Sequence, residues 1–356
     1  MQACYKFFDL YKEMGVNVLS GWWHVTDYAT DREGYKDDKN VSAFADFINY
    51  MIKIKGYDNI IYMQPSNEPY GTYTTFPDWS SFIKKTYDLC VQKGYPTDRL
   101  CGPDSWDDWL GMAVQWNRRE LVSYNFHFYF DGTKPTSENL GVYDQLMQQM
   151  KQVTDNSNKP VICAESGAIN GNWLDWPANK PEDGIYSFSY LYGLYMLDFA
   201  IQSMRAGVAS SLSWGLQGFD QNKDAGMWNN TGQWGGLKLR PIFYSWSLLC
   251  RLFPDGAKVL NMTQQSSKVK IGGVLIGDKD YSFIICNRAT YSEKCNIAIP
   301  SNSQKTYYIY EYSEDNQGDG VQLTLPFTTV IPDELITAEV PANGALFITT
   351  LQPNNF

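Results

Sequence analysis

Hydrophobic positions along the first 254 residues follow two alternating periods. Segments with apolar residues three and four positions apart are typical of amphipathic helices, and these are expected at about 2–14, 80–93, 142–153, 186–206 and 241–253. Short apolar runs between them predict strands at about 16–22, 59–63, 99–102, 122–128, 160–164 and 209–214. Asp78 and Ser80 are both candidate N-caps of the second helix, and Gly94 is expected to end it. Strands that alternate with helices indicate a parallel sheet covered by helices, with an α/β fold of the (β/α)8 TIM-barrel type as the expected closure.

The pattern changes at about residue 255. Apolar residues then alternate with polar ones along short segments, as at Tyr281, Phe283 and Ile285, and glycine-rich turns such as Gly272-Gly273 separate the segments. A period of two with frequent turn signals predicts an all-β module, most simply a small sandwich. We therefore expect a catalytic barrel over residues 1–254 and a C-terminal β-sandwich over residues 255–356.

The composition narrows the range of functions. A net charge of −10 argues against nucleic-acid binding, which needs a basic surface, and against adhesion to anionic lipid. The most apolar long segment, 185–204, contains Asp198 and is expected to be a buried helix, so membrane insertion is not expected. Aromatic residues make up 15 % of the chain, and their faces can stack on sugar rings, although most are expected in the core.

The cysteine and histidine patterns disfavour a metal site. The seven cysteines are widely spaced without a C-x-x-C pair, and the chain has two histidines. A zinc site is therefore not expected, and we interpret the thiols as buried and free, although Cys286 and Cys295 could bridge neighbouring strands. We expect neither a metal nor an organic cofactor.

Two glutamates follow apolar strands. Glu68 lies in Ser66-Asn67-Glu68-Pro69 after the strand at 59–63, and Glu165 lies in Ala164-Glu165-Ser166-Gly167 after the strand at 160–164. Because the carboxyl ends of parallel barrel strands meet on one face, both carboxylates are expected on the same rim. Such a pair can cleave a glycosidic bond, one as acid and base and the other as nucleophile. Taken singly, Glu68 could be a helix cap and Glu165 an exposed turn residue.

Four short motifs in this order resemble those of the retaining β-glycoside hydrolases of clan A, including families 5, 30 and 39: Asn67-Glu68-Pro69, His127-Phe128-Tyr129, Glu165-Ser166-Gly167 and Ser213-Trp214-Gly215. The resemblance spans residues 15–254. It implies that Glu68 is the acid/base and Glu165 the nucleophile. It further implies that Asn67, His127 and Tyr129 hold the sugar and tune the carboxylates, Tyr129 by donating a hydrogen bond to the nucleophile, and that Trp214 forms the floor of the −1 subsite.

One departure from the clan pattern lies near the N-terminus. Clan members have three strands before the one that ends in Asn-Glu-Pro, whereas only the segment at 16–22 reads as such a strand here. A βα unit needs about 30 residues, so the 67 residues before Glu68 are too few for three. We therefore hypothesise that the chain lacks the first two βα units of a complete barrel. The absence of a secretory signal pattern agrees with this hypothesis.

Further aromatic and histidine side chains are candidates for sugar contacts. Trp23 and His24 end the strand at 16–22, Trp106 follows the strand at 99–102, and Trp173 lies in the long segment after Glu165. For any one of these tryptophans, ordinary packing is the simpler interpretation, and His24 could equally be a loop residue without a role.

The sequence favours a retaining glycoside hydrolase that cleaves β-linked glycosides or polysaccharides through a glycosyl-enzyme intermediate. The alternative is a non-catalytic carbohydrate-binding protein on a degenerate barrel, and a transglycosidase would use the same residues. In each case the partner is a carbohydrate. The resemblance implies an extracellular or periplasmic location, whereas the sugar, the linkage and the oligomeric state are left open.

Overall fold

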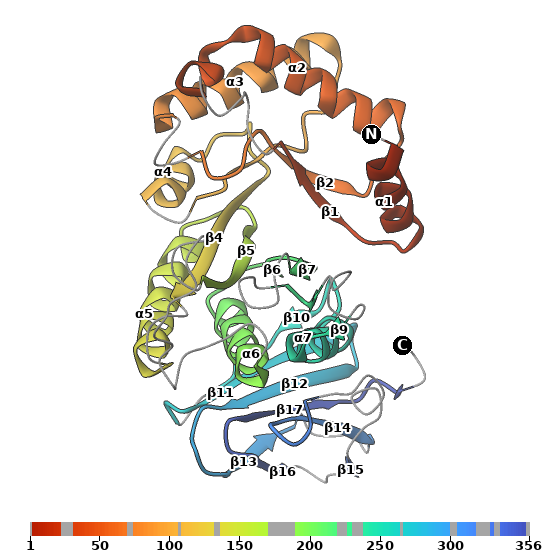
Figure 1. Ribbon diagram of the computed structural model, residues 1–356, viewed down its shortest axis with the longest axis vertical. Coiled ribbons are helices and arrows are strands. Elements are labelled where there is room, and N and C mark those ends of the chain that lie inside the picture. The colour runs from red at the N-terminus through yellow and green to blue at the C-terminus, as the bar shows by residue number, and fades with distance from the viewer. Residues whose placement is uncertain are drawn as a thin grey trace. The chain divides into compact units, whose positions relative to one another are not determined.

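The computed structural model describes residues 2–22, 31–69, 74–105, 108–131, 136–169, 189–218, 226–229, 238–263, 266–299, 305–317, 328–330 and 335–353. The chain divides into two compact units (Figure 1). The first contains Met1–Phe128, Gln152–Glu165 and Val208–Leu212, and the second contains Tyr129–Lys151, Ser166–Gly207 and Ser213–Phe356. The domain boundary expected at 254/255 follows the change in hydrophobic pattern, and it stays a prediction.

The six strands predicted over the first 254 residues all form, but one of them, Val161–Ile169, extends beyond the apolar run at 160–164, so Glu165 lies within a strand and not after it. β1 (Val18–Gly21) pairs in parallel with β2 (Ile60–Gln64), and β3 (Cys101–Pro103) pairs in parallel with β4 (Ser123–Asp131). A parallel bridge between Met63 and Leu100 connects these two pairs. The second sheet continues from β4 to β5 (Val161–Ile169) and then to β6 (Ser210–Ser213). The α/β class is confirmed, whereas closure into a barrel and the lack of two βα units stay predictions.

Helices alternate with these strands. They are α1 (Gln2–Glu13), α2 (Asp38–Asn49), α3 (Phe76–Lys93), α4 (Asp108–Trp116), α5 (Thr136–Asp155), α6 (Tyr190–Arg205) and α7 (Pro241–Leu252), with a 3-10 turn at Asp31–Lys36 and a π-turn at Tyr50–Ile54. Within these described residues, none of the helices is both long and apolar enough to cross a membrane.

The start of α3 corrects one prediction. Its N-cap is Thr75, whose hydroxyl accepts a hydrogen bond from the Asp78 backbone N–H at 3.3 Å, and neither Asp78 nor Ser80 caps the helix. Pro77 lies in the first turn, where its fixed φ and missing N–H favour a helix start, so the helix begins one turn earlier than its apolar periodicity suggests. Gly94 ends α3 with a φ of 69°, as expected.

Strand β4 has one apolar face and one polar face. Tyr124, Phe126 and Phe128 alternate with Asn125 and His127, and all five side chains are buried. Since successive side chains of a strand point to opposite faces, the aromatic residues anchor the strand in the core while Asn125 and His127 share the other face. This alternation places a buried histidine on the polar face of β4.

The second unit contains the β-module. The strands of this module are β10 (Lys258–Val259), β11 (Val269–Ile276), β12 (Asp280–Asn287), β13 (Glu293–Ala298), β14 (Tyr307–Tyr312), β15 (Thr328–Val330), β16 (Leu335–Val340) and β17 (Gly344–Thr349). Three short strands before the module, β7 (Gln217–Gly218), β8 (Trp228–Asn229) and β9 (Lys238–Leu239), form a separate sheet. One sheet has the order β10-β11-β12-β17-β14-β15, and β13 pairs with β16. A buried cluster draws Phe283 and Ile285 from the larger sheet and Ile297 and Ile336 from the smaller one, the packing expected of a sandwich.

The opposite face of the larger sheet is covered by helices. Ile284 and Cys286 of β12 alternate with the sandwich-facing residues and pack with Leu197 of α6 and Leu248 of α7. The sheet is therefore buried on both faces. The described cysteines are free, so the bridge considered between Cys286 and Cys295 does not form, and Cys4 and Cys250 are exposed, contrary to the expectation of buried thiols.

Candidate active site

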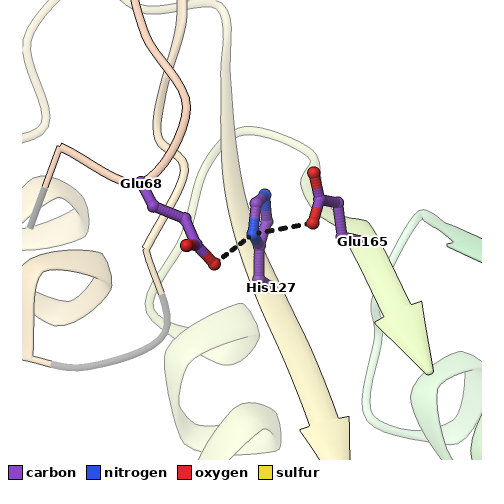
Figure 2. A group of neighbouring side chains, drawn as sticks. All are labelled: Glu68, His127 and Glu165. Atoms are coloured by element: carbon purple, nitrogen blue, oxygen red, sulfur yellow. Dashed lines mark hydrogen bonds and ion pairs between the residues drawn. The ribbon is translucent and has the colours of Figure 1, made fainter. Parts of the chain in front are cut away.

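Glu68, His127 and Glu165 converge in the first unit (Figure 2). Glu68 lies four residues beyond the end of β2, His127 lies on β4 and Glu165 lies on β5. One carboxylate oxygen from each glutamate and one ring nitrogen of His127 all lie within 4.8 Å of one another. The Glu68 side chain is 53 % exposed and that of Glu165 15 % exposed, so solvent reaches both carboxylates.

The imidazole of His127 lies between three carboxylates. Its Nδ1 lies 2.8 Å from Glu68 Oε1 and 3.2 Å from Glu165 Oε2, and its Nε2 lies 2.9 Å from Asp104 Oδ1. Burial by itself lowers the pKa of His127. The negative charge and hydrogen bond of Asp104, the hydrogen bond of Glu68 and the charge of Glu165 outweigh burial and raise this pKa to about 10. The ring is therefore a cation at neutral pH.

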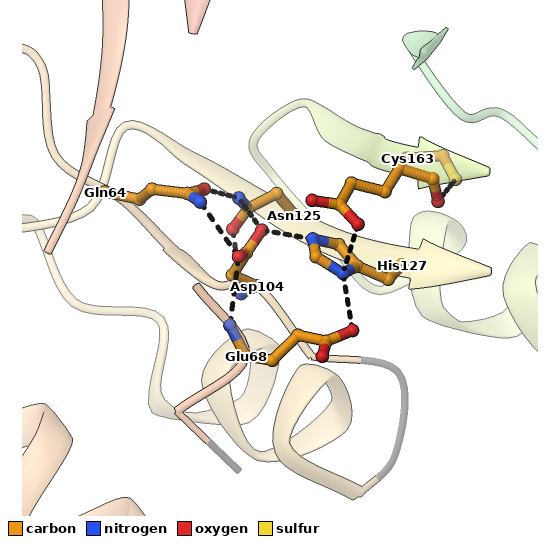
Figure 3. Close-up of polar contacts among 7 residues, drawn as sticks. Gln64, Glu68, Asp104, Asn125, His127 and Cys163 are labelled. Carbon is orange, nitrogen blue, oxygen red and sulfur yellow. Dashed lines mark hydrogen bonds and ion pairs between the residues drawn. The ribbon is translucent and has the colours of Figure 1, made fainter. Parts of the chain in front are cut away.

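Asp104 lies directly after β3 and is 1 % exposed. Its Oδ1 accepts a hydrogen bond from Asn125 Nδ2 at 2.9 Å, and its Oδ2 accepts one from Gln64 Nε2 at 2.8 Å. The backbone N–H of Glu68 also donates to Oδ2, at 3.3 Å (Figure 3). A single buried carboxylate thus connects the ends of β2 and β3 with Asn125 and His127 inside β4.

Two of the site residues, Glu68 and Asp104, have unusual backbone conformations. Glu68 has a φ of 39° and Asp104 a φ of 62°, in the left-handed region that side chains other than glycine rarely adopt. Such conformations cost roughly 1–3 kcal/mol each and persist where the surrounding contacts enforce them. Their coincidence at one cluster marks this part of the first unit as a functional candidate.

The same three residues could offer ligand atoms to a metal ion. A metal needs the neutral imidazole, whereas the pKa of about 10 leaves His127 protonated at pH 7. Both ring nitrogens also already face carboxylate oxygens. The donor set therefore suits proton chemistry better than metal ligation.

The remaining predicted site residues fall into two groups. Asn67 and Trp214 are partly buried next to Glu68 and after β6, and Tyr129 is partly buried two positions beyond His127 on β4. Their contacts with substrate or nucleophile stay predictions. Trp23, His24, Trp106 and Trp173 lie outside the described residues.

Three buried site residues were not predicted to have a role. Asp104, Gln64 and Asn125 form the layer behind His127. Asp104 follows an apolar strand just as Glu68 does, and Asn125 precedes His127 by two positions on the same strand face, so both signals are present in the sequence. Their mutual contacts depend on strand order, which a single-strand pattern does not contain.

Comparison with known proteins gives structural neighbours only. No family model and no curated protein matches the sequence. A family 30 endoxylanase from Clostridium papyrosolvens has a TM-score of 0.61 at 14 % identity, covering 89 % of this chain and 72 % of its own. The catalytic domain of a family 30 xylanase from Talaromyces cellulolyticus has a TM-score of 0.62 at 16 % identity, with coverages of 88 % and 67 %. A family 51 α-L-arabinofuranosidase from Bifidobacterium longum has a TM-score of 0.67 at 12 % identity, with coverages of 97 % and 78 %.

These neighbours are clan A glycoside hydrolases, TIM barrels with a C-terminal domain. The chain is therefore similar in fold to clan A glycoside hydrolases, as its motifs predicted, while closure of its own strands into a barrel stays a prediction. At identities of 12–16 % the likeness concerns the fold alone, so function is argued from the site.

Proposed function

We propose that the protein is a retaining glycoside hydrolase. The proposal rests on one distance: a carboxylate oxygen of Glu68 lies within 4.8 Å of a carboxylate oxygen of Glu165. Retaining enzymes hold their two carboxyl groups about 5–5.5 Å apart, whereas inverting enzymes separate them by about 6.5–9.5 Å to admit a water molecule. The spacing supports direct attack by one glutamate on the anomeric carbon.

The two glutamates take different steps in this reaction. Glu165 attacks the anomeric carbon as Glu68 protonates the leaving oxygen, so the glycosidic bond breaks and a glycosyl ester forms on Glu165. Glu68 then removes a proton from water, the water oxygen attacks the anomeric carbon, and the ester bond to Glu165 breaks. Each glutamate returns to its starting protonation state, and the product keeps the anomeric configuration of the substrate.

Exposure agrees with these roles. The half-exposed Glu68 can exchange protons with water between turnovers, whereas Glu165 is held more deeply on β5. The positive imidazole of His127 lies 3.2 Å from Glu165 Oε2, so its charge stabilises the carboxylate that attacks the anomeric carbon. The motifs further imply that Asn67, Tyr129 and Trp214 contact the sugar.

The proposed substrate is a β-linked glycoside or polysaccharide outside the cytoplasm, bound in a barrel-type site. The neighbours do not fix the sugar, since their names include a xylanase and an α-L-arabinofuranosidase. A transglycosidase would form the same intermediate and differ only in its acceptor.

The experiment is turnover of a panel of aryl β-glycosides with proton NMR of the first-formed anomer. Glu165→Ala should abolish turnover, and Glu68→Ala should lower it by about 10²–10⁴-fold on substrates with poor leaving groups. Azide should partly rescue Glu68→Ala on activated aryl glycosides and give a glycosyl azide of retained configuration, because azide attacks without base assistance.

Glu13→Gln, an exposed glutamate on α1, is the control and should behave as the unmodified protein. Inversion of the anomeric configuration would refute the retaining mechanism. Sugar binding without turnover on any linkage tested, with equal affinity in Glu165→Gln, would indicate a non-catalytic carbohydrate-binding protein instead.

A further inference from the structure

The deepest charged group of the site is Asp104, which touches neither solvent nor the space between the two glutamates. Its carboxylate is 1 % exposed and accepts hydrogen bonds from Gln64, Asn125 and His127 and from the backbone of Glu68 (Figure 3). Four donors around one buried carboxylate fix its position and its orientation, because each of them holds one of its two oxygens. Neither the sequence motifs nor the proposed reaction gives Asp104 a role.

We infer that Asp104 is a positioning residue that keeps His127 as the cation between Glu68 and Glu165 and fixes the turn that carries Glu68. The inference deepens the proposed glycoside hydrolysis and rests on it for its catalytic consequence. Its structural part, the charge state of His127, is independent of any substrate.

The geometry of the imidazole indicates the doubly protonated form. The described neighbours of Nε2 and Nδ1 are carboxylate oxygens at 2.8–3.2 Å, namely Asp104 Oδ1 on one side and Glu68 Oε1 and Glu165 Oε2 on the other. Asp104 already accepts from three other donors, and Glu165 must be unprotonated to act as nucleophile, so the nitrogens that face these two residues each carry a proton even when Glu68 holds the proton of the general acid. A neutral tautomer would set a nitrogen lone pair against a carboxylate.

Asp104 dominates this arrangement because of its burial. Glu68 is 53 % exposed, so water screens its charge, whereas the His127–Asp104 pair is shielded at 3 % and 1 % exposure. The other titratable groups near the pair are Glu165 and the thiols of Cys101 and Cys163. Burial raises the pKa of both thiols, which keeps them neutral. The pKa of His127, raised to about 10, agrees with this assignment.

Two amides hold Asp104 in the required orientation. Asn125 uses its Oδ1 to accept from the Asp104 backbone N–H at 3.0 Å, which directs its Nδ2 toward Asp104 Oδ1 and Gln64 Oε1. Gln64 Nε2 then points to Asp104 Oδ2. Since Oδ2 also accepts from the backbone of Glu68, the carboxylate couples the cation on β4 to the turn after β2.

The first test uses the fact that the chain has two histidines. NMR of imidazole carbon-labelled protein follows both rings as the pH is varied, and His127→Asn assigns the His127 signal, leaving His24 as an internal reference. In the unmodified protein His127 should titrate near pH 10. In Asp104→Asn, which is similar in size but uncharged, its midpoint should fall by about 1–3 pH units.

The control is Asp198→Asn, because Asp198 is another fully buried carboxylate paired with a cation, Arg288, in the second unit. It should change stability without changing the His127 midpoint. A His127 midpoint near the ordinary value of about 6.5 in the unmodified protein would overturn the inference without any variant. An unchanged midpoint in folded Asp104→Asn would overturn it as well.

The second test is the pH profile of kcat/KM. In Asp104→Asn the positive charge of His127 is lost as the pH passes its lowered midpoint, so the basic limb of the profile should shift together with the His127 midpoint that NMR records. A fall in kcat at every pH with unmoved limbs would mean a purely structural role and overturn the inference. If the unmodified protein turns over no substrate, the proposed function fails, while the NMR titration still decides the charge state of His127.

Discussion

Replacement of Gly102 by alanine should lower the stability of the first unit and the activity of the site. A Cβ at Gly102 would lie 2.5 Å from Cζ2 of Trp79, closer than atoms in proteins approach, and Trp79 is 1 % exposed. Trp79 cannot retreat freely because Phe76, Trp109 and Trp116 pack around it within 6.2 Å between ring centroids. Overpacking of this kind costs about 1–3 kcal/mol, and we expect the upper end. Since Asp104 lies two residues further on, kcat should fall as well.

Denaturant unfolding measures this effect, and two other variants define its cause. Gly111→Ala on α4 is the matched control, because an added Cβ there meets nothing within 4 Å, so it should be neutral or stabilising by up to about 1 kcal/mol. Trp79→Phe removes the ring atoms in the way and should make the double variant more stable than additivity predicts, by at least about 1 kcal/mol. Gly102→Ala protein as stable as the unmodified chain, or strict additivity with Trp79→Phe, would refute the reasoning.

Two further predictions concern buried charges. Arg288→Met should lower the free energy of unfolding by about 3–5 kcal/mol, because it removes the arginine that pairs with buried Asp198, and adding Asp198→Leu should restore much of the loss. Urea unfolding of the unmodified protein and of these two variants checks this. The folded pKa of His127, about 10, exceeds the unfolded value of about 6.5, so its protonation stabilises the fold fully below pH 6.5. This contribution to the free energy of unfolding, at most about 4–5 kcal/mol, should disappear as the pH rises through 10. Unfolding measured over a series of pH values checks it. The prediction is contradicted if His127→Gln loses as much stability as the unmodified protein when the pH is raised through this range.

The parts of this fold that the sequence predicts are those fixed by local hydrophobicity. The apolar run Ile60-Ile61-Tyr62-Met63 has no polar face to expose, so it reads as a buried strand, and it forms most of β2. Glu68 and Glu165 could be paired for the same reason, since strand direction brings the ends of parallel strands to one face. Helix α2 was not predicted. Its buried residues Val41, Phe44, Ala45 and Ile48 do lie at helical spacing, but the polar residues around them hide this periodicity in the sequence.

The parts that could not be predicted are contacts whose partners are far apart in the chain. Gln64 and Asn125 are 61 positions apart, and nothing in either local segment indicates that their amides meet. Asp104 is 23 positions from His127 and follows a short strand of three residues. Such contacts depend on the register between β2, β3 and β4, which forms only when the apolar faces of these strands pack.

Burial explains why the polar groups behind the two glutamates are all hydrogen-bonded to one another. Asn125 and His127 share β4 with Phe126 and Phe128, so packing of the aromatic face forces the polar face inward as well. An unpartnered buried amide costs about 1–3 kcal/mol, and an unpartnered buried charge costs more. Each of these groups is satisfied by another member of the same cluster. Removal of any one member therefore takes one hydrogen-bond partner from another buried member, so stability and the charge state of His127 should change together at Gln64, Asp104 and Asn125.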